Sequence, residues 1–226
     1  MKTGNVYKSK HSEKLFMALY DRQLKSLNVG YEDLWIDTRF GKTHVIKTGN
    51  QNGKPLLVIH GGNYTTPYEL IKLMCVAPQT VEKSVLVVPA GFANASIFRL
   101  MMSAGIPMIL YAITKKEKWL KKVILPAAVE EKNIDDATLE MFKYSLEHVA
   151  VKNHIPTIVN AGDLRRYTAP TFIIVSEYDR VFPADKTLAK AKEVIQNLKT
   201  HILKGQGQKF FLSDVDIDMI VRFINE

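Results

Sequence analysis

Three short polar segments carry the residue types that acyl-transfer chemistry uses. The first is the His-Gly-Gly-Asn run at residues 60–63. Glycines leave backbone N–H groups open to a substrate oxygen, which is how an oxyanion hole is built. A glycine-rich turn without any chemistry is the alternative interpretation of this segment taken alone.

The second and third segments lie near the C-terminus. Asp179 comes shortly after the apolar run at residues 172–175, and a carboxylate in that position can orient a histidine. The alternative is that Asp179 pairs with Arg180 or caps a turn. In the third segment, Gly205 and Gly207 predict a mobile loop that presents the side chain of Gln208.

Each of these segments follows a short apolar run of the kind found in strands that are buried on both faces. Ligands of α/β sheets bind at the carboxyl ends of such strands, so we expect the three segments to share one edge. The four predicted buried strands lie at residues 56–59, 85–88, 172–175 and 200–203.

The remaining patterns complete an α/β architecture. Residues 31–48 alternate like two antiparallel strands joined by a turn at 39–42. Apolar spacing predicts helices at 12–27 and 185–199, and Ser213 with Asp216 forms a capping box that opens a final helix. A hairpin followed by alternating strands and helices predicts a mostly parallel sheet.

Residues 92–165 interrupt this alternation. They are rich in Met, Leu and Ile and have a helical pattern, so we interpret them as a helical cap or lid inserted into the core. The core domain then comprises residues 1–91 and 166–226. The densest basic cluster lies inside the insertion, at Lys115, Lys116, Lys118, Lys121 and Lys122.

Composition excludes several classes of protein. With 226 residues, 46% hydrophobic and 24% charged, the chain is neither disordered, collagen-like nor a coiled coil. The single cysteine, Cys75, excludes an intrachain disulfide framework and a cysteine-based zinc cluster. No apolar leader follows Met1 and no stretch is suited to a membrane span, so a cytoplasmic protein is expected.

The net charge of +8 admits anionic partners. No zinc-finger spacing, RNA-binding aromatic run or DNA-reading motif accompanies the lysine cluster, so no nucleic-acid partner is expected. We interpret the cluster as a solvated helix face. A basic lid helix that faces a membrane is the alternative.

Taken in this order, the segments resemble the α/β-hydrolase fold, and in particular the small bacterial carboxylesterase-like hydrolases with a helical cap. Residues 57–63 resemble the oxyanion segment of that family, 84–93 the strand before the cap, and 168–183 the strand and loop of the catalytic acid. The resemblance implies that Gly62 and Asn63 lie near an oxyanion hole and that Asp179 is the acid. It implies a small hydrophobic ester or acyl ligand, with no cofactor and no metal.

The nucleophile of that family is absent. None of the nine serines lies in a Gly-x-Ser-x-Gly motif, and residues 63–70 run directly into 71–78. Two βα units of the family, or roughly 60 residues at about 30 each, are therefore missing. Closing the gap predicts one fused helix at 67–77 and places the strand at 56–59 beside the strand at 85–88.

The base is absent as well. Gln208 occupies the position of the family's histidine, and an amide cannot take and return a proton at neutral pH. Cys75 and Ser103 lie in helical patterns and are interpreted as packing residues, so we assign no nucleophile. His148 and His154 are six residues apart, which is not the spacing of two metal ligands on one helix face.

The sequence therefore predicts an α/β-hydrolase-family protein of carboxylesterase-like ancestry that is catalytically impaired, a pseudoenzyme. One alternative is a non-catalytic protein that binds a ligand in the cleft under the cap. Another is a hydrolase with an unconventional nucleophile. Loss of core units would also leave apolar cap residues such as Ile106, Met108 and Leu110 without a floor, which favours self-association.

Overall fold

The computed structural model describes residues 6–26, 28–38, 41–58, 71, 73–94, 96, 101–150, 158–160 and 162–226. Contacts divide the chain into two compact units. Unit one comprises Met1–Val58 with Lys143–Lys152, and unit two comprises Ile59–Phe142 with Asn153–Glu226.

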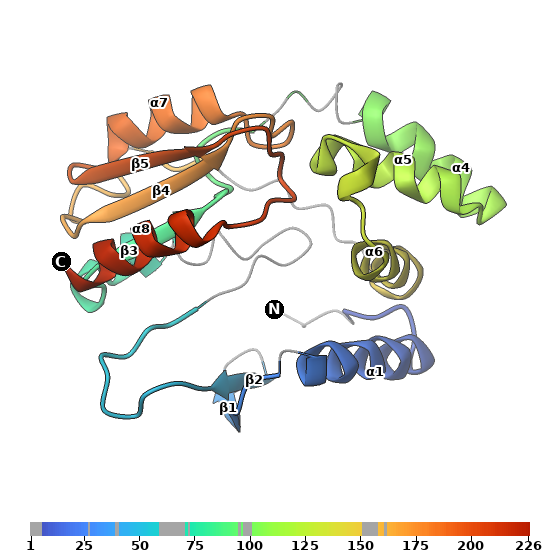
Figure 1. Ribbon diagram of the computed structural model, residues 1–226, viewed down its shortest axis with the longest axis horizontal. Helices are drawn as coiled ribbons and strands as arrows, with labels where there is room; N and C mark the ends of the chain where they lie inside the picture. The colour runs from blue at the N-terminus through green and yellow to red at the C-terminus, as the bar shows by residue number, and fades with distance from the viewer. Residues whose placement is uncertain are drawn as a thin grey trace. The chain divides into compact units, whose positions relative to one another are not determined.

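Unit one contains a helix and a two-stranded antiparallel hairpin (Figure 1). The helix is α1 (Lys10–Ser26), and the strands are β1 (Glu32–Thr38) and β2 (Gly41–Lys47). The hairpin pairs Glu32 with Lys47 at its open end and Thr38 with Gly41 at its turn. The predicted hairpin and N-terminal helix are both confirmed, while residues 27, 39 and 40 lie outside the described part.

His44 connects the hairpin to α1. Its ring stacks on Trp35 with centroids 4.6 Å apart. Its two ring nitrogens share hydrogen bonds with the Tyr20 hydroxyl at 2.7 Å and with Asp33 Oδ1 at 2.8 Å. His44 is therefore a structural residue of unit one.

The run Leu56–Val58 corrects one prediction. These residues form no strand, and their side chains are 65% to 77% exposed. The predicted buried strand, and its pairing with residues 85–88, are therefore wrong for 56–58, while Ile59 lies outside the described residues. A strand needs a partner in register, and this run belongs to unit one whereas residues 85–88 belong to unit two.

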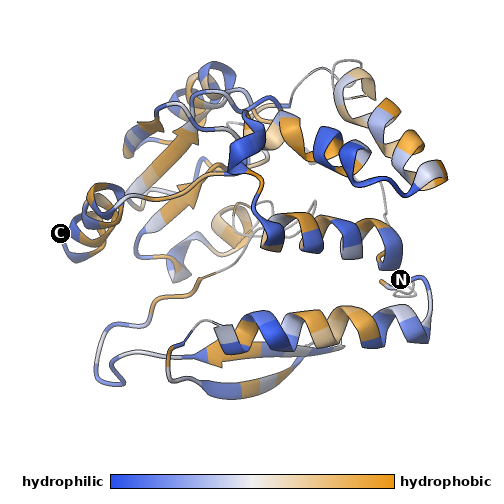
Figure 2. Ribbon diagram, turned by 45° about the vertical axis from the view of Figure 1, so that its right-hand side comes forward, coloured by the Kyte–Doolittle hydropathy of each residue, from blue (hydrophilic) through white to orange (hydrophobic). Residues whose placement is uncertain are grey.

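Unit two is built on a parallel sheet with the order β3-β4-β5. Its strands are β3 (Ser84–Val87), β4 (Thr171–Ser176) and β5 (Leu198–Leu203). Every residue of β4 is buried, as the predicted two-sided burial requires. Figure 2 shows the hydrophobic colouring of the strands in this sheet. The three predicted strands at 85–88, 172–175 and 200–203 are confirmed.

Two helices cover opposite faces of this sheet, α7 (Ala184–Val194) and α8 (Asp214–Asn225) (Figure 1). Successive side chains of a strand point to opposite faces, so β4 serves two cores. Ile173 and Val175 pack in the cluster that contains Ala191 of α7. Phe172 and Ile174 pack with Phe223 of α8.

The sequence predicted the start of α8 correctly, but it did not predict the end of α7. The capping box is confirmed, since Ser213 N donates to Asp216 Oδ2 at 2.8 Å and Asp216 N donates to Ser213 Oγ at 3.3 Å. The helix predicted at 185–199 instead ends at Val194. Its last predicted residues belong to β5, where they pair with β4 from Leu198 onward.

Most of the described residues between β3 and β4 lie in helices or helical turns. This region contains the π-helical turn η2 (Met101–Gly105), α4 (Ile106–Thr114), α5 (Glu117–Ala128), the 3-10 turn η3 (Glu131–Asn133) and α6 (Asp136–His148). The boundaries of the predicted cap remain a prediction.

The predicted helix at 67–77 is described only in part. Residues 71 and 73–76 are helical, with Ile71 and Met74 buried in the core, whereas 67–70 and 72 lie outside the described residues. Ala77 precedes the 3-10 turn η1 (Pro78–Thr80). Within the described residues, no helix is both long enough and apolar enough to cross a bilayer.

Candidate functional site

Two of the three predicted segments meet at the carboxyl edge of the parallel sheet. The loop after β4 receives the loop after β5 through two backbone hydrogen bonds, from Glu177 N to Leu203 O at 3.0 Å and from Tyr178 N to Gln206 O at 2.8 Å. Parallel neighbouring strands end at the same edge, so this meeting follows from the sheet order.

Glu177 reinforces the junction, although the sequence did not single it out. Its carboxylate accepts hydrogen bonds from Gly205 N at 2.9 Å and from Lys204 Nζ at 3.2 Å. The Gly205 bond, followed by the Lys204 bond, lowers the pKa of Glu177 below its usual value. The carboxylate is therefore occupied in joining the two loops.

Asp179 is unusual for this edge because it is a carboxylate and yet only 5% exposed. Its Oδ1 atom accepts hydrogen bonds from Val181 N at 2.7 Å and Phe182 N at 2.9 Å, which caps the turn. Its Oδ2 atom is buried and has no partner among the described residues. Burial raises the pKa of Asp179 to about 6, although the two backbone N–H groups oppose the shift.

Two hydroxyl groups resemble Asp179 Oδ2 in being buried without a described partner. Ser176 Oγ at the last residue of β4 and Thr187 Oγ1 in the first half of α7 are buried and also lack a partner among the described residues. Buried polar atoms are nearly always hydrogen-bonded. The region around the C-terminal end of β4 is therefore unusual, because three buried polar atoms there have no described partner. The position of Ser176 directly after an apolar run was the only sequence signal for them.

The strand beside β4 ends in strained backbone at the same edge. Val88 directly follows β3 and has a φ of 48°. A β-branched residue rarely adopts this left-handed conformation, and such strain gathers at functional sites. Val88 N donates to Ile174 O at 2.7 Å, so the sheet holds the strained residue in place.

The loop that carries Gln208 is packed, which corrects the prediction of a mobile loop. Gly207 is buried, and a Cβ atom there would lie 2.7 Å from Val129 Cγ2 and would also collide with the Ala127 carbonyl oxygen. Lys209 N donates to Ala127 O at 2.9 Å, and Lys209 Nζ lies 2.7 Å from Asp135 Oδ2. Glycine is needed here for close packing, and Gln208 is half-buried beside it.

An open hollow of about 330 Å³ lies at this carboxyl edge. Its polar lining comes from Glu177, Asp179, Asp185 and Lys204, and its apolar lining from Pro183, Ala184, Leu188 and Ile202. The acid position of the resemblance therefore borders a surface depression where ligands of α/β sheets bind.

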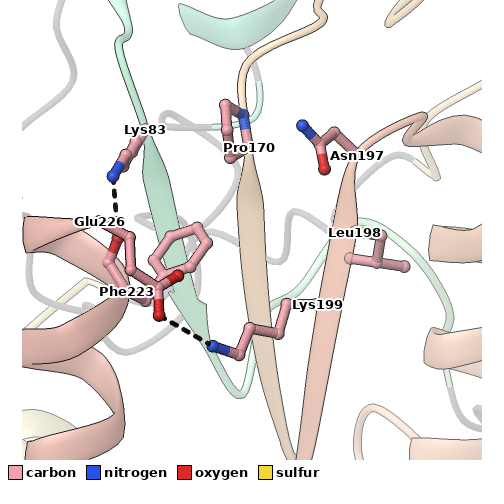
Figure 3. A pocket seen from close by; sticks show the side chains of 7 residues that line it. All are labelled: Lys83, Pro170, Asn197, Leu198, Lys199, Phe223 and Glu226. Carbon is pink, nitrogen blue, oxygen red and sulfur yellow. Dashed lines mark hydrogen bonds and ion pairs between the residues drawn. The ribbon is translucent and has the colours of Figure 1, made fainter.

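A second hollow of about 360 Å³ lies at the opposite, amino edge of the sheet (Figure 3). Its charged groups already have partners: Lys83 Nζ donates to Phe223 O at 3.1 Å, and Lys199 Nζ lies 4.0 Å from Glu226 Oε1. These contacts attach the C-terminal end of α8 to the sheet. They do not indicate a reactive site.

The other predicted site residues lie apart or outside the described part. Gly62 and Asn63, the expected oxyanion donors, are not among the described residues, and neither are His60 and His154. Cys75 is partly buried against the core, and burial, followed by Asp163, raises its pKa, which disfavours the reactive thiolate.

The remaining candidates are structural. Ser103 lies in the turn η2, which contacts α5. His148 shares a hydrogen bond of 3.3 Å with Ser12, and His201 shares one of 2.9 Å with Asp216 of the capping box. Among the described residues, no three His, Cys, Asp or Glu side chains are grouped to hold a metal ion.

In sequence, the chain matches a known carboxylesterase over a short segment. No family model matches the chain. A segment of 51 residues is 35% identical to carboxylesterase YbfK of Bacillus subtilis (strain 168), and it covers 23% of this chain but 17% of that protein. The chain thus matches that relative over well under two thirds of its length.

Solved structures match nearly the whole chain. Naproxen esterase (carboxylesterase NP) from Bacillus subtilis superposes with a TM-score of 0.78 at 13% identity, over 96% of this chain and 100% of that one. Carboxylesterase CesB (YbfK) from the same species gives 0.75 at 13% identity, over 96% and 99%. Another hydrolase structure from Bacillus subtilis gives 0.75 at 14% identity, over 96% of this chain and 100% of that one. The predicted α/β-hydrolase-like fold is confirmed.

Proposed function

We propose that this chain, which has the α/β-hydrolase fold of the Bacillus carboxylesterases, is a carboxylesterase-like protein that does not hydrolyse esters by a serine mechanism. The observation that carries the proposal is Asp179. It lies after β4 at the carboxyl edge of the sheet, where the resemblance implies the catalytic acid, and its buried Oδ2 atom has no partner among the described residues.

In a catalytic triad the acid accepts a hydrogen bond from the imidazole and stabilises its charged form. A neighbouring imidazolium would lower the pKa of the acid, whereas burial raises the pKa of Asp179 to about 6. Gln208 stands where the base of the resemblance would stand, and an amide cannot move the proton. These features together support loss of the base.

Loss of the nucleophile has separate support. No Gly-x-Ser-x-Gly motif is present in the sequence. The relative YbfK is about a third longer than this chain, because the same 51 residues are 23% of one and 17% of the other. The structural matches extend over almost all of both chains. This chain is shorter than its relative and still matches the solved structures over almost their whole length. Both facts support a deletion inside this chain, at the place where the segment with the nucleophile would lie.

The test measures hydrolysis of a p-nitrophenyl ester by the purified chain, together with labelling by a fluorophosphonate probe. We expect no labelling and at most the slow residual turnover that an oxyanion hole and binding alone can give. Saturable turnover that a serine-directed inhibitor abolishes would contradict the proposal. Labelling would instead identify an unconventional nucleophile, which Cys75→Ala and Ser103→Ala variants would then locate.

A further inference from the structure

A strip of apolar side chains lies exposed along η2 and α4. We call it the apolar strip, and it has six members that are 44% to 75% exposed. They are Met101, Met102, Ile106, Met108, Ile109 and Ile113. The opposite side of α4 is buried through Pro107 and Tyr111, and α4 packs on α5.

Four members of the apolar strip share one helix face. Met102, Ile106, Ile109 and Ile113 follow one another at intervals of four, three and four residues, which places them on one helix face. An isolated exposed apolar residue needs no explanation, but a contiguous patch of several marks an interaction surface.

The segment directly after the strip is strongly basic. Lys116, Lys118 and Lys122 are exposed, and the whole stretch from 101 to 128 contains five lysines and a single acidic residue, Glu117. Glu117 pairs with Lys121 at 3.0 Å. Trp119 lies between Lys118 and Lys122, whose ammonium groups are 5.1 Å and 5.0 Å from its ring centroid.

The positive charge beside the apolar strip favours an anionic lipid surface over a second copy of the chain as the binding partner. Two copies of the chain that docked through the same strip would bring two lysine clusters together, and like charges oppose that contact. An anionic lipid surface instead offers an apolar layer for the isoleucines and negative headgroups for the lysines. Trp119 suits the boundary between the two layers.

We propose that η2, α4 and the lysines at the start of α5 dock onto the surface of an anionic membrane. Helix α4 has nine residues and no described helix can cross a bilayer, so the strip lies in the plane of the interface. The inference does not depend on the proposed loss of esterase activity, because none of its residues belongs to the carboxyl edge of the sheet.

The test is co-sedimentation of the full chain with vesicles of phosphatidylcholine alone and of phosphatidylcholine with phosphatidylserine. We expect at least about a hundredfold stronger partitioning to the anionic vesicles in 0.1 M salt, because each lysine near the surface contributes about 1 kcal/mol. The difference should shrink as salt is raised, since the electrostatic attraction is screened.

Two variants separate the apolar and the electrostatic contributions. Ile109→Ser with Ile113→Ser should weaken anionic binding more than about tenfold, since each isoleucine buries apolar area in the interface. The triple variant Lys116→Gln, Lys118→Gln and Lys122→Gln should weaken it about a hundredfold, since three lysines are lost.

Matched controls lie on other helices. Val215→Ser with Ile217→Ser removes two exposed apolar side chains of α8, and Lys10→Gln, Lys14→Gln and Lys25→Gln removes three exposed lysines of α1. Both controls should bind as the unchanged chain does. The proposal is overturned if the chain does not bind, if the variants bind like the controls, or if the isoleucine variant abolishes a dimer in lipid-free solution.

Discussion

The two edges of the parallel sheet differ in how their polar side chains are paired. At the amino edge, the partly buried Lys83 donates to a C-terminal carbonyl of α8, and the exposed Lys199 pairs with the carboxylate of Glu226, which follows α8. At the carboxyl edge, Asp179 Oδ2, Ser176 Oγ and Thr187 Oγ1 are buried without a partner among the described residues. Folding alone favours paired groups, so buried polar groups that have no partner in the described part of the chain suggest a constraint other than stability. The difference teaches that the carboxyl edge is the place to look for a present or former site.

The largest expected effect concerns the packing of the carboxyl edge. Gly207→Val should destabilise the protein by about 3 kcal/mol or more, because its side chain would enter space held by Ala127 and Val129. Urea unfolding measures the change. Gly162→Ala is the matched control, since a Cβ atom there meets nothing within 4 Å, and it should change stability by less than about 0.5 kcal/mol. An equal effect of both substitutions would show that the loop is not packed as described.

The next largest effect concerns how the ionisation of Asp179 changes the stability of the protein with pH. Its pKa of about 6 in the folded state lies above the ordinary value of 3.8, so the folded protein holds the proton more tightly. Stability should therefore fall as pH rises from about 4 to about 6 and stay lower above that range. Asp179→Asn should remove this loss and raise stability at pH 7.5 by about 1 to 2 kcal/mol.

Unfolding curves of both proteins between pH 4 and pH 8 test this prediction. A variant that is less stable than the unchanged chain at pH 7.5 would mean that the carboxylate has a partner that offsets its burial. The apparent contrast between the two edges would then disappear.

A smaller loss is expected at the amino edge. Lys83→Met removes the hydrogen bonds to Phe223 O at 3.1 Å and Ile224 O at 3.4 Å, which satisfy the C-terminus of α8. We expect a loss of about 1 kcal/mol by thermal unfolding. Lys186→Met, at an exposed position of α7, is the control and should have almost no effect. A gain in stability on replacing Lys83 would indicate that its pairing does not offset its burial.

The smallest effect is expected at Gln208. Gln208→His alone should leave the rate of ester hydrolysis unchanged, because a base without a nucleophile has no proton to take. Stability should change by less than about 0.5 kcal/mol, since the side chain is only half-buried. A p-nitrophenyl ester assay of the single variant measures the first quantity. A gain of turnover would reveal a nucleophile that both the sequence and the described structure leave unassigned.

The predictable parts of the fold depend on short-range patterns. The alternation at 31–48 and the apolar runs at 172–175 and 200–203 specify strands whose partners are nearby or fill a two-sided core. The capping box at Ser213 uses atoms only three residues apart, so it could be recognised without any tertiary information. The position of Asp179 after a buried strand was visible for the same reason.

The sequence by itself therefore determined the fold class, the hairpin, three parallel strands and the absence of a nucleophile motif. Only the tertiary structure decided which buried polar atoms have no partner among the described residues, how Gly207 packs, and that Leu56–Val58 form no strand despite their apolarity. The physical reason is that apolarity and backbone propensity are local properties, whereas strand pairing, close packing and hydrogen-bond satisfaction depend on residues far away in the chain.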